Sequence, residues 1–230
     1  MARLKTLLSW SSGKDSAWTL HRLRNDVRFE VVGLLTTINS AADRVAMHAV
    51  RSELLRAQAD AAGLPLWPVP IPSPCSNEEY ERAMSEAMTR AEAEGVECMA
   101  FGDLFLEDVR AYREEKLAAT RLRPIFPLWG SDTRSLAAEM IAGGLRARIT
   151  CVDPRVAPRS LAGSDFDPRA LPLDVDPCGE RGEFHTFAYA GPMFRAPIAI
   201  ESGEVVERDG FVFADLLWTA LATPALSLRS

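Results

Sequence analysis

The sequence predicts an α/β protein in which a parallel-sheet domain is followed by a smaller α+β domain. In the first half, short apolar runs alternate with amphipathic helical segments, the order that produces a parallel sheet. In the last third, apolar and polar residues alternate between glycine-containing turns, which is typical of antiparallel strands. Pro124 and Pro127 interrupt the first pattern, so we divide the chain into residues 1–123 and 124–230.

The expected elements follow one another in a regular order. Apolar runs indicate strands at 4–10, 29–37, 66–71 and 98–101, and helical periodicity indicates helices at 15–24, 45–62, 77–94 and 106–120. Gly63 and Pro65 end the second helix, and Asn77 caps the third. The remainder predicts a helix at 133–142, a strand at 145–152, a long loop at 153–182 and an antiparallel meander at 184–213.

Composition narrows the class of protein. The 230 residues are 47% hydrophobic and 25% charged, enough for an ordinary globular core, and both a monomer and a homodimer fit such a chain. A net charge of −6 argues against general nucleic-acid binding, which needs a basic surface. The first apolar run is too short for a signal peptide or a membrane span, and the four cysteines are too widely spaced for a zinc or redox pair. We therefore expect a cytoplasmic protein.

The most informative segment is the loop Ser11-Ser12-Gly13-Lys14-Asp15-Ser16, which lies between the first strand and the first helix. Its backbone N–H groups and the positive end of the helix dipole favour an anion. Ser11, Ser12 and Ser16 add hydroxyl donors, and Gly13 permits a close approach of the backbone. Lys14 is one of three lysines among 26 basic residues, which suggests that a compact ammonium is needed there.

Three interpretations of this loop can be compared. A Walker loop is excluded because Leu8 stands where its first glycine would be and Asp15 where it has Ser or Thr. A capped helix without a ligand is the simplest alternative. The six residues resemble the PP-loop, Ser-Gly-Gly-x-Asp-Ser, of the N-type ATP pyrophosphatases, with Ser12 in place of the commoner glycine.

The PP-loop resemblance implies roles for individual residues. ATP would be cleaved between its α and β phosphates, an acceptor would be adenylated, and pyrophosphate would stay in the loop. Lys14 would neutralise β and γ phosphate oxygens, and Asp15 would hold the loop or a Mg²⁺ ion shared with the nucleotide. His48 lies near the place where related proteins receive adenine, although helix packing or capping is the simpler role for it.

Four further segments resemble the diphthine-ammonia ligase family. They are AFGDLFLEDVR at residues 100–110, the short stretches at 113–114 and 127–129, and above all DPCGERGEFHTF at 176–187. The resemblance covers nearly the whole chain and implies an N-terminal domain like the adenine nucleotide alpha hydrolases and a C-terminal domain that recognises the acceptor. It implies that a carboxylate, on a small molecule or a protein, becomes an acyl adenylate from which ammonia displaces AMP.

One residue departs from the ligases that modify diphthine in elongation factor 2. His185 stands where those enzymes usually have glutamate. The motif with histidine resembles a bacterial subgroup for which a role in cobalamin salvage has been suggested. We therefore expect the same chemistry on a different acceptor and poor activity on diphthine.

Candidate substrate-binding residues follow the fourth strand. Gly102 and Asp103 end that strand, at the edge where parallel sheets bind ligands, and Asp103 would bind metal, orient the acceptor or cap the next helix. Arg110 and Arg113 share one helical face, which suits a carboxylate or phosphate group, although a solvated face is the commoner explanation.

The other candidates lie where the long loop enters a strand. Alternation along the strand places Glu183 and His185 on one side. It places Phe184 and Thr186 on the other side. We therefore expect Glu183 and His185 to be catalytic and Thr186 to help bind the substrate. Glu180 is expected to anchor the loop or to bind ammonia.

Two other function classes use similar folds. PP-loop enzymes that modify tRNA need paired cysteines or a persulfide-carrying partner and a basic surface, and this chain has no such cysteine pair and a negative net charge. A non-catalytic ATP-binding regulator would need the loop but not the segment at 179–186. Acceptor-dependent formation of AMP and pyrophosphate separates a ligase from a regulator.

Overall fold

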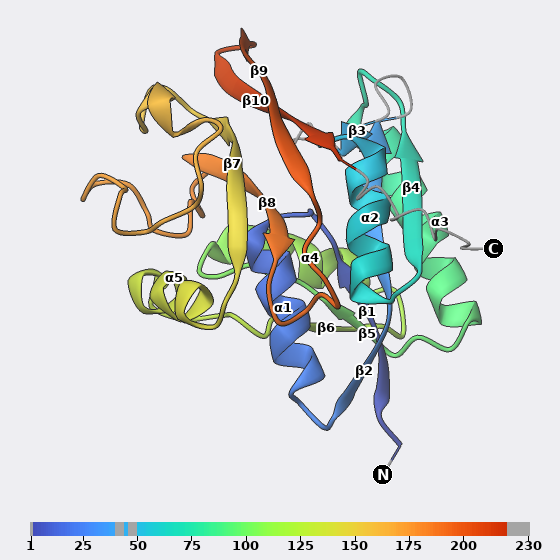
Figure 1. The fold of residues 1–230 in the computed structure, drawn as a ribbon. Coiled ribbons are helices and arrows are strands. Elements are labelled where there is room, and N and C mark those ends of the chain that lie inside the picture. Colours follow the sequence, from blue (N-terminus) through green and yellow to red (C-terminus); the bar gives the residue numbers. More distant parts are fainter. Residues whose placement is uncertain (1, 40–43, 46–49, 220–230) are drawn as a thin grey trace, which may run out of the picture.

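The computed structural model describes residues 2–39, 44–45 and 50–219. Its first sheet consists of β1 (Leu4–Ser9), β2 (Phe29–Asn39), β4 (Leu66–Ile71), β5 (Cys98–Ala100) and β6 (Arg123–Ile125) (Figure 1). These strands are parallel and lie in the order β4-β2-β1-β5-β6, while the short β3 (Arg44–Val45) pairs antiparallel with the end of β2. The predicted α/β class with a parallel sheet is confirmed.

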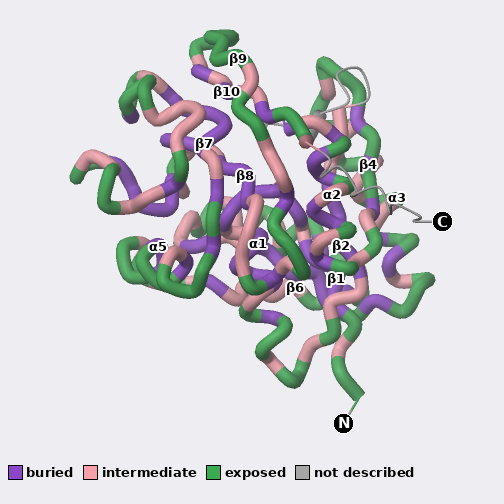
Figure 2. Tube along the Cα trace, in the orientation of Figure 1, coloured by how far each residue is buried: buried purple, intermediate pink, exposed green. Residues whose placement is uncertain are grey.

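Helices cover both faces of this sheet. The helices α1 (Lys14–Arg24) and α2 (Ser52–Ala62) lie on one face, and α3 (Asn77–Ala93) and α4 (Glu107–Leu117) contribute to the core on the other. Neighbouring residues of β1 show why: Leu8 packs in the cluster that contains α1 and α2, whereas Leu7 packs in the cluster that contains α3 and α4. Figure 2 shows buried residues gathered along the central strands.

Two predicted helix boundaries are corrected by the structure. The second helix begins at Ser52, and its expected first residue, Val45, lies in β3 instead. The third helix is capped by Ser76 rather than Asn77, because the Ser76 hydroxyl accepts from Glu79 N while the Glu79 carboxylate accepts from Ser76 N. Gly63 ends α2 in the left-handed conformation, as predicted.

The sheet continues past the predicted domain boundary. β6 pairs in parallel with β5 and contains Pro124, which is tolerated because β6 is an edge strand. The boundary between residues 123 and 124 therefore falls inside a strand of the first sheet. The division of the chain into two domains stays a prediction.

A second, antiparallel sheet forms the C-terminal region after α5 (Thr133–Ala142). It contains β7 (Arg146–Val152), β8 (Phe184–Ala190), β9 (Ile200–Arg208) and β10 (Phe211–Trp218), and a short 3-10 helix (Arg159–Leu161) lies in the long loop before β8. The order is β8-β7-β10-β9, so the simple meander predicted for 184–213 is wrong. β7 and β10 are the inner strands, and β7 is mostly buried, whereas β9 is mostly exposed and forms an edge.

The second sheet packs against helices that cover the first sheet. Helix α1 contacts both β1 and β8, and α2 contacts β10, so these two helices lie between the sheets.

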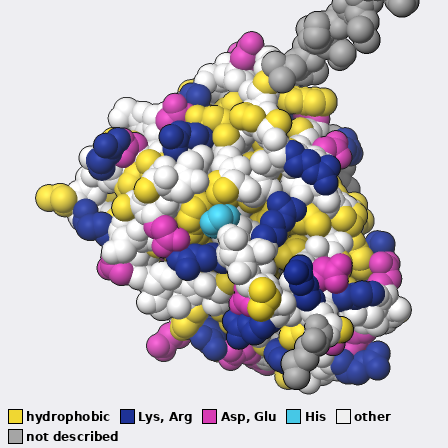
Figure 3. Space-filling view, turned by 60° about the horizontal axis from the view of Figure 1, so that its bottom comes forward, with side chains coloured by type: hydrophobic (Ala, Val, Ile, Leu, Met, Phe, Trp, Pro, Cys, Tyr) yellow, Lys and Arg dark blue, Asp and Glu magenta, His cyan; other side chains and the backbone are white. Residues whose placement is uncertain are grey.

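On the face shown in Figure 3, basic and acidic side chains are interspersed rather than gathered by sign. Among the described residues, no helix combines the length and hydrophobicity that a membrane crossing requires.

Candidate functional site

The loop at residues 11–16 is held by the second sheet as well as by its own strand and helix. Gly13 precedes α1 without a side-chain cap. The hydroxyl of Thr186, on β8, accepts a hydrogen bond from Lys14 N at 3.0 Å, and Ala188 N donates to Ser12 O at 2.9 Å. Thr186 thus satisfies one of the N–H groups that the start of a helix leaves without an intrahelical partner.

Ser12 is the strained residue of this loop. Its φ of 70° lies in the left-handed region, which costs a residue other than glycine about 1–2 kcal/mol. The Ser12 hydroxyl is buried and has no hydrogen-bond partner among the described residues. Strain and an unpaired buried polar group at one residue are features of ligand sites. A left-handed position favours glycine, the residue that the PP-loop pattern commonly has here.

The first turn of α1 supplies further unpaired polar groups. Asp15 Oδ1 is buried without a hydrogen-bond partner in the described part of the chain, and Ser16 N–H donates to none of those residues. Gly102 lies directly against this turn, since a Cβ atom on it would be 3.2 Å from the Asp15 carbonyl carbon. The segment that follows β5 therefore meets the loop. Gly102, which the sequence predicted to bind substrate, lies at this contact.

Lys14 does not lie on the surface of the loop. It is 2% exposed, and its ammonium donates to Asp15 Oδ2 at 2.8 Å and to the carbonyl oxygen of Cys178. The ammonium also lies 5.3 Å from the centre of the Phe184 ring. Burial lowers the pKa of Lys14, but the charges of Asp15 and its acidic neighbours outweigh it, so the pKa is raised and the ammonium stays charged. Its expected contact with phosphates stays a prediction.

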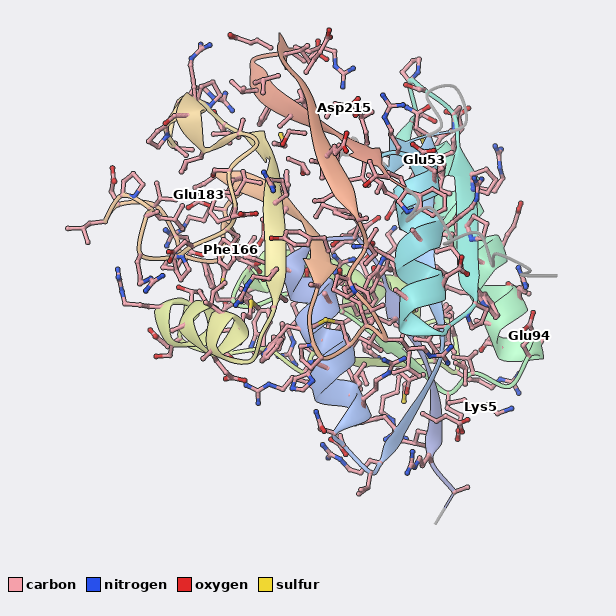
Figure 4. The ribbon with its side chains drawn as sticks, viewed as in Figure 1. Lys5, Glu53, Glu94, Phe166, Glu183 and Asp215 are labelled. Atoms are coloured by element: carbon pink, nitrogen blue, oxygen red, sulfur yellow. The ribbon has the colours of Figure 1, made fainter. Side chains whose placement is uncertain are left out.

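Asp176 and Glu183 organise the segment that carries the family motif. Asp176 Oδ1 accepts from Cys178 N at 2.8 Å and Oδ2 accepts from the Thr133 hydroxyl at 2.9 Å. The Glu183 carboxylate is 5% exposed and accepts from Asp176 N at 3.3 Å and Arg181 N at 3.0 Å. Figure 4 shows Glu183 on the same side of β7 as Phe166. These contacts suit a loop anchor, a role that the sequence suggested for Glu180.

Glu180 carries a partly buried carboxyl group with a raised pKa. Its Oε1 accepts from Leu104 N at 2.7 Å, which ties the motif to the end of β5. Burial raises the pKa of Glu180 to about 7, and the carboxylates of Asp15 and Asp103 add to this rise. Gly179 makes the turn before it, at a φ of 67°. Such a carboxyl group exchanges a proton near neutral pH.

One side of β8 meets Lys14, and it is not the side that carries the expected catalytic residues. Phe184 and Thr186 share a side, as alternation predicts, but it is this side that meets Lys14. His185 lies between them and pairs with Cys151 of β7. Burial lowers the pKa of His185 to about 4, and the charge of Lys14 contributes, so the imidazole is neutral at pH 7.

Asp103 and the two arginines of α4 form a group beside the site. Asp103 accepts two hydrogen bonds from Arg113, at 2.6 and 3.1 Å, and the cap of α4 is Leu106, so Asp103 is not the helix cap. Arg110 pairs with Glu114 at 2.8 Å and lies over aromatic rings that follow β6. Both arginines therefore have partners within the chain.

One residue that was expected to bind the nucleotide, His48, lies outside the described residues. No group of three or more His, Cys, Asp or Glu side chains with metal-site geometry occurs among the residues that the structure describes. Sequence reasoning did not single out Asp176 or Thr133, although Asp-Pro before Cys-Gly is a recognisable turn signal for Asp176.

A known protein family matches the first half of the chain. The sequence profile of the family described as "Diphthamide synthase N-terminal domain" matches residues 4–119, which cover β1 to α4 and include the whole loop. The chain belongs to this family. The predicted family resemblance is thereby confirmed for the half of the chain that holds the strained Ser12.

Several similar proteins are named diphthine–ammonia ligase. The diphthine–ammonia ligase of Bos taurus is 29% identical over 157 residues, which are 65% of this chain and 59% of the relative. The human protein of that name is 28% identical over 152 residues, or 63% and 57% of the two chains. The Danio rerio protein is 29% identical over 175 residues, 68% of each chain. The chain thus spans less than two thirds of the length of the mammalian relatives.

Proposed function

We propose that this member of the family is an ATP-dependent ligase that adenylates a carboxylate, releases pyrophosphate and transfers the acyl group to ammonia. The observation that carries the proposal is the loop at residues 11–16, where Ser12 has a strained backbone and where the Ser12 hydroxyl and Asp15 Oδ1 are buried without a partner among the described residues. A structure keeps such costs where a ligand offsets them. The names of the relatives supply the reaction type.

The loop suits the β and γ phosphates of ATP. Ser16 N–H and the Ser12 hydroxyl are donors that have no acceptor within the described part of the chain, and the N-terminus of α1 favours negative charge. Asp15 Oδ1 is a carboxylate oxygen that no described residue contacts by a hydrogen bond, which fits Mg²⁺, since this ion is commonly held by one or two carboxylates together with nucleotide phosphates. When bound, the ion would neutralise phosphate charge.

Glu180 is suited to handle the proton of the nitrogen donor. Ammonium must lose a proton before its nitrogen attacks the acyl carbon, after which the bond from that carbon to the AMP oxygen breaks and AMP leaves. A carboxyl with a pKa of about 7 is half ionised at neutral pH and accepts that proton. We therefore assign ammonium binding and deprotonation to Glu180, while Glu183 holds the loop.

The acceptor is proposed to be a carboxylate other than diphthine. A neutral His185 can donate a hydrogen bond to an acceptor carboxylate without the repulsion that a glutamate would bring. Asp103, which follows β5, and its hydrogen-bond partner Arg113 on α4 would line the acceptor site. The four cysteines are free thiols, which supports the cytoplasmic location that we propose for the enzyme.

Nucleotide analysis tests the proposal. The purified chain would be incubated with ATP, Mg²⁺, ammonium and either diphthine-bearing elongation factor or small anionic carboxylates, including corrinoid carboxylates. We expect acceptor-dependent AMP and pyrophosphate, strongly reduced by Asp15→Asn. ADP as the only product would refute adenylation. ATP binding without turnover of any acceptor would favour the regulator, and turnover only with tRNA would favour the tRNA-modifying class.

A further inference from the structure

Gln58 is a buried polar residue that the proposed chemistry does not use. It lies on α2, has no exposed surface and makes hydrogen bonds to three different parts of the chain. Its Oε1 accepts from Trp10 Nε1 at 2.9 Å, and its Nε2 donates to Ser12 O at 2.9 Å and to Ala188 O at 2.6 Å. An indole N–H only donates and carbonyl oxygens only accept, so the orientation of the amide is unambiguous.

The position of these partners gives Gln58 a specific effect on the loop. Ser12 O receives two donors, Gln58 Nε2 from α2 and Ala188 N from β8. Both therefore fix the plane of the peptide that joins Ser12 to Gly13. In a trans peptide the N–H points opposite to the C=O, so holding the oxygen toward α2 and β8 aims Gly13 N–H to the opposite side. On that side Gly13 N–H donates a hydrogen bond to Ser11 Oγ at 3.4 Å.

We infer that Gln58 is a positioning residue for the nucleotide: it holds the Ser12–Gly13 peptide and thereby fixes the loop in the conformation that binds the phosphates. The inference rests on the proposed binding of ATP at this loop. Ser12 is left-handed and does not have the conformational freedom of glycine, so its conformation must be held from outside. Gln58 does this while also tying β8 to the loop, so both halves of the chain build the phosphate site.

Three substitutions separate positioning from simple packing. Gln58→Met keeps the approximate size of the side chain and removes all three hydrogen bonds. Gln58→Glu keeps the shape but turns an oxygen toward the carbonyls of Ser12 and Ala188, which a carboxylate cannot satisfy and a protonated carboxyl can satisfy once. Trp10→Phe is the matched control, because it removes one hydrogen bond of the same amide and leaves both Nε2 contacts in place.

The readouts are ATP affinity by calorimetry, thermal stability and amide exchange of Ala188, whose N–H donates to Ser12 O. We expect Gln58→Met to weaken ATP binding by about tenfold and to speed Ala188 exchange, while Trp10→Phe loses stability but binds ATP within about twofold of wild type. ATP affinity of Gln58→Glu should recover between pH 8 and pH 5.5 more than that of wild type. This pH dependence is not expected from packing.

Each outcome decides one question. A wild-type protein that does not bind ATP refutes the proposed function and, with it, the purpose assigned to Gln58. If wild type binds ATP and Gln58→Met binds equally well, only the inference fails. It also fails if Trp10→Phe and Gln58→Met lose affinity in proportion to their loss of stability. Should Gln58→Met not fold, Gln58→Glu at pH 5.5 provides the folded variant for the same comparison.

Discussion

Replacing Lys14 tests whether its buried ammonium group stabilises the folded protein. Lys14→Met keeps the aliphatic length but removes the ammonium that pairs with Asp15 and with the carbonyl of Cys178. Breaking a buried ion pair from one side commonly costs 3–5 kcal/mol, and the Asp15 side chain is 26% exposed, so water offsets part of the loss and we expect about 3 kcal/mol. For a chain of this size that is a fall in Tm of about 6–12 °C.

Urea denaturation followed by circular dichroism measures this change, with Lys116→Met as the matched control. Lys116 pairs with Glu81 on the surface, so its loss should leave the midpoint unchanged within error. The double variant Lys14→Met/Asp15→Asn should be more stable than Lys14→Met alone, because it leaves no unpaired buried charge. Equal midpoints for Lys14→Met and Lys116→Met would refute the view that the buried Lys14 ammonium stabilises the fold.

Other predictions concern protonation, space and the acceptor. The folded pKa of Glu180, about 7, lies above its ordinary value of 4.5, so this carboxyl's contribution to stability is full below pH 4.5 and is lost as the pH rises through 7. Wild type should therefore lose Tm relative to Glu180→Gln across this range, and a pH-independent difference would contradict the raised pKa. Gly102→Ala should raise the KM for ATP, because the added Cβ would lie 3.2 Å from the Asp15 carbonyl carbon; an unchanged KM would show that β5 can shift freely. His185→Glu should lower AMP formation with small anionic acceptors relative to diphthine, and an unchanged ratio would show that His185 does not select the acceptor.

The roles that we propose within the segment at residues 176–187 differ from those expected from the sequence, and individual contacts give the reason. Sequence alternation correctly separates Phe184 and Thr186 from Glu183 and His185, but it cannot say which side faces the loop. That side is decided by docking of β8 on α1, where the Thr186 hydroxyl meets Lys14 N. Glu180 and Glu183 look equivalent in the sequence, and only their hydrogen-bond partners distinguish an anchored carboxylate from one with a pKa near 7.

The sequence by itself determined the features that depend on neighbours in the chain. The strand, the loop at residues 11–16 and helix α1 follow from local periodicity and small residues, and the unusual Ser12 stands at the one left-handed position of that loop. Tertiary structure decided the burial of Lys14, the strand order β8-β7-β10-β9 and the contacts of Gln58. Lys14 and Thr186 are 172 residues apart, and Gln58 and Ala188 are 130 apart, so no local pattern encodes either contact. Such contacts form only when the second sheet packs against α1 and α2, because the polar groups that they satisfy are buried by that packing.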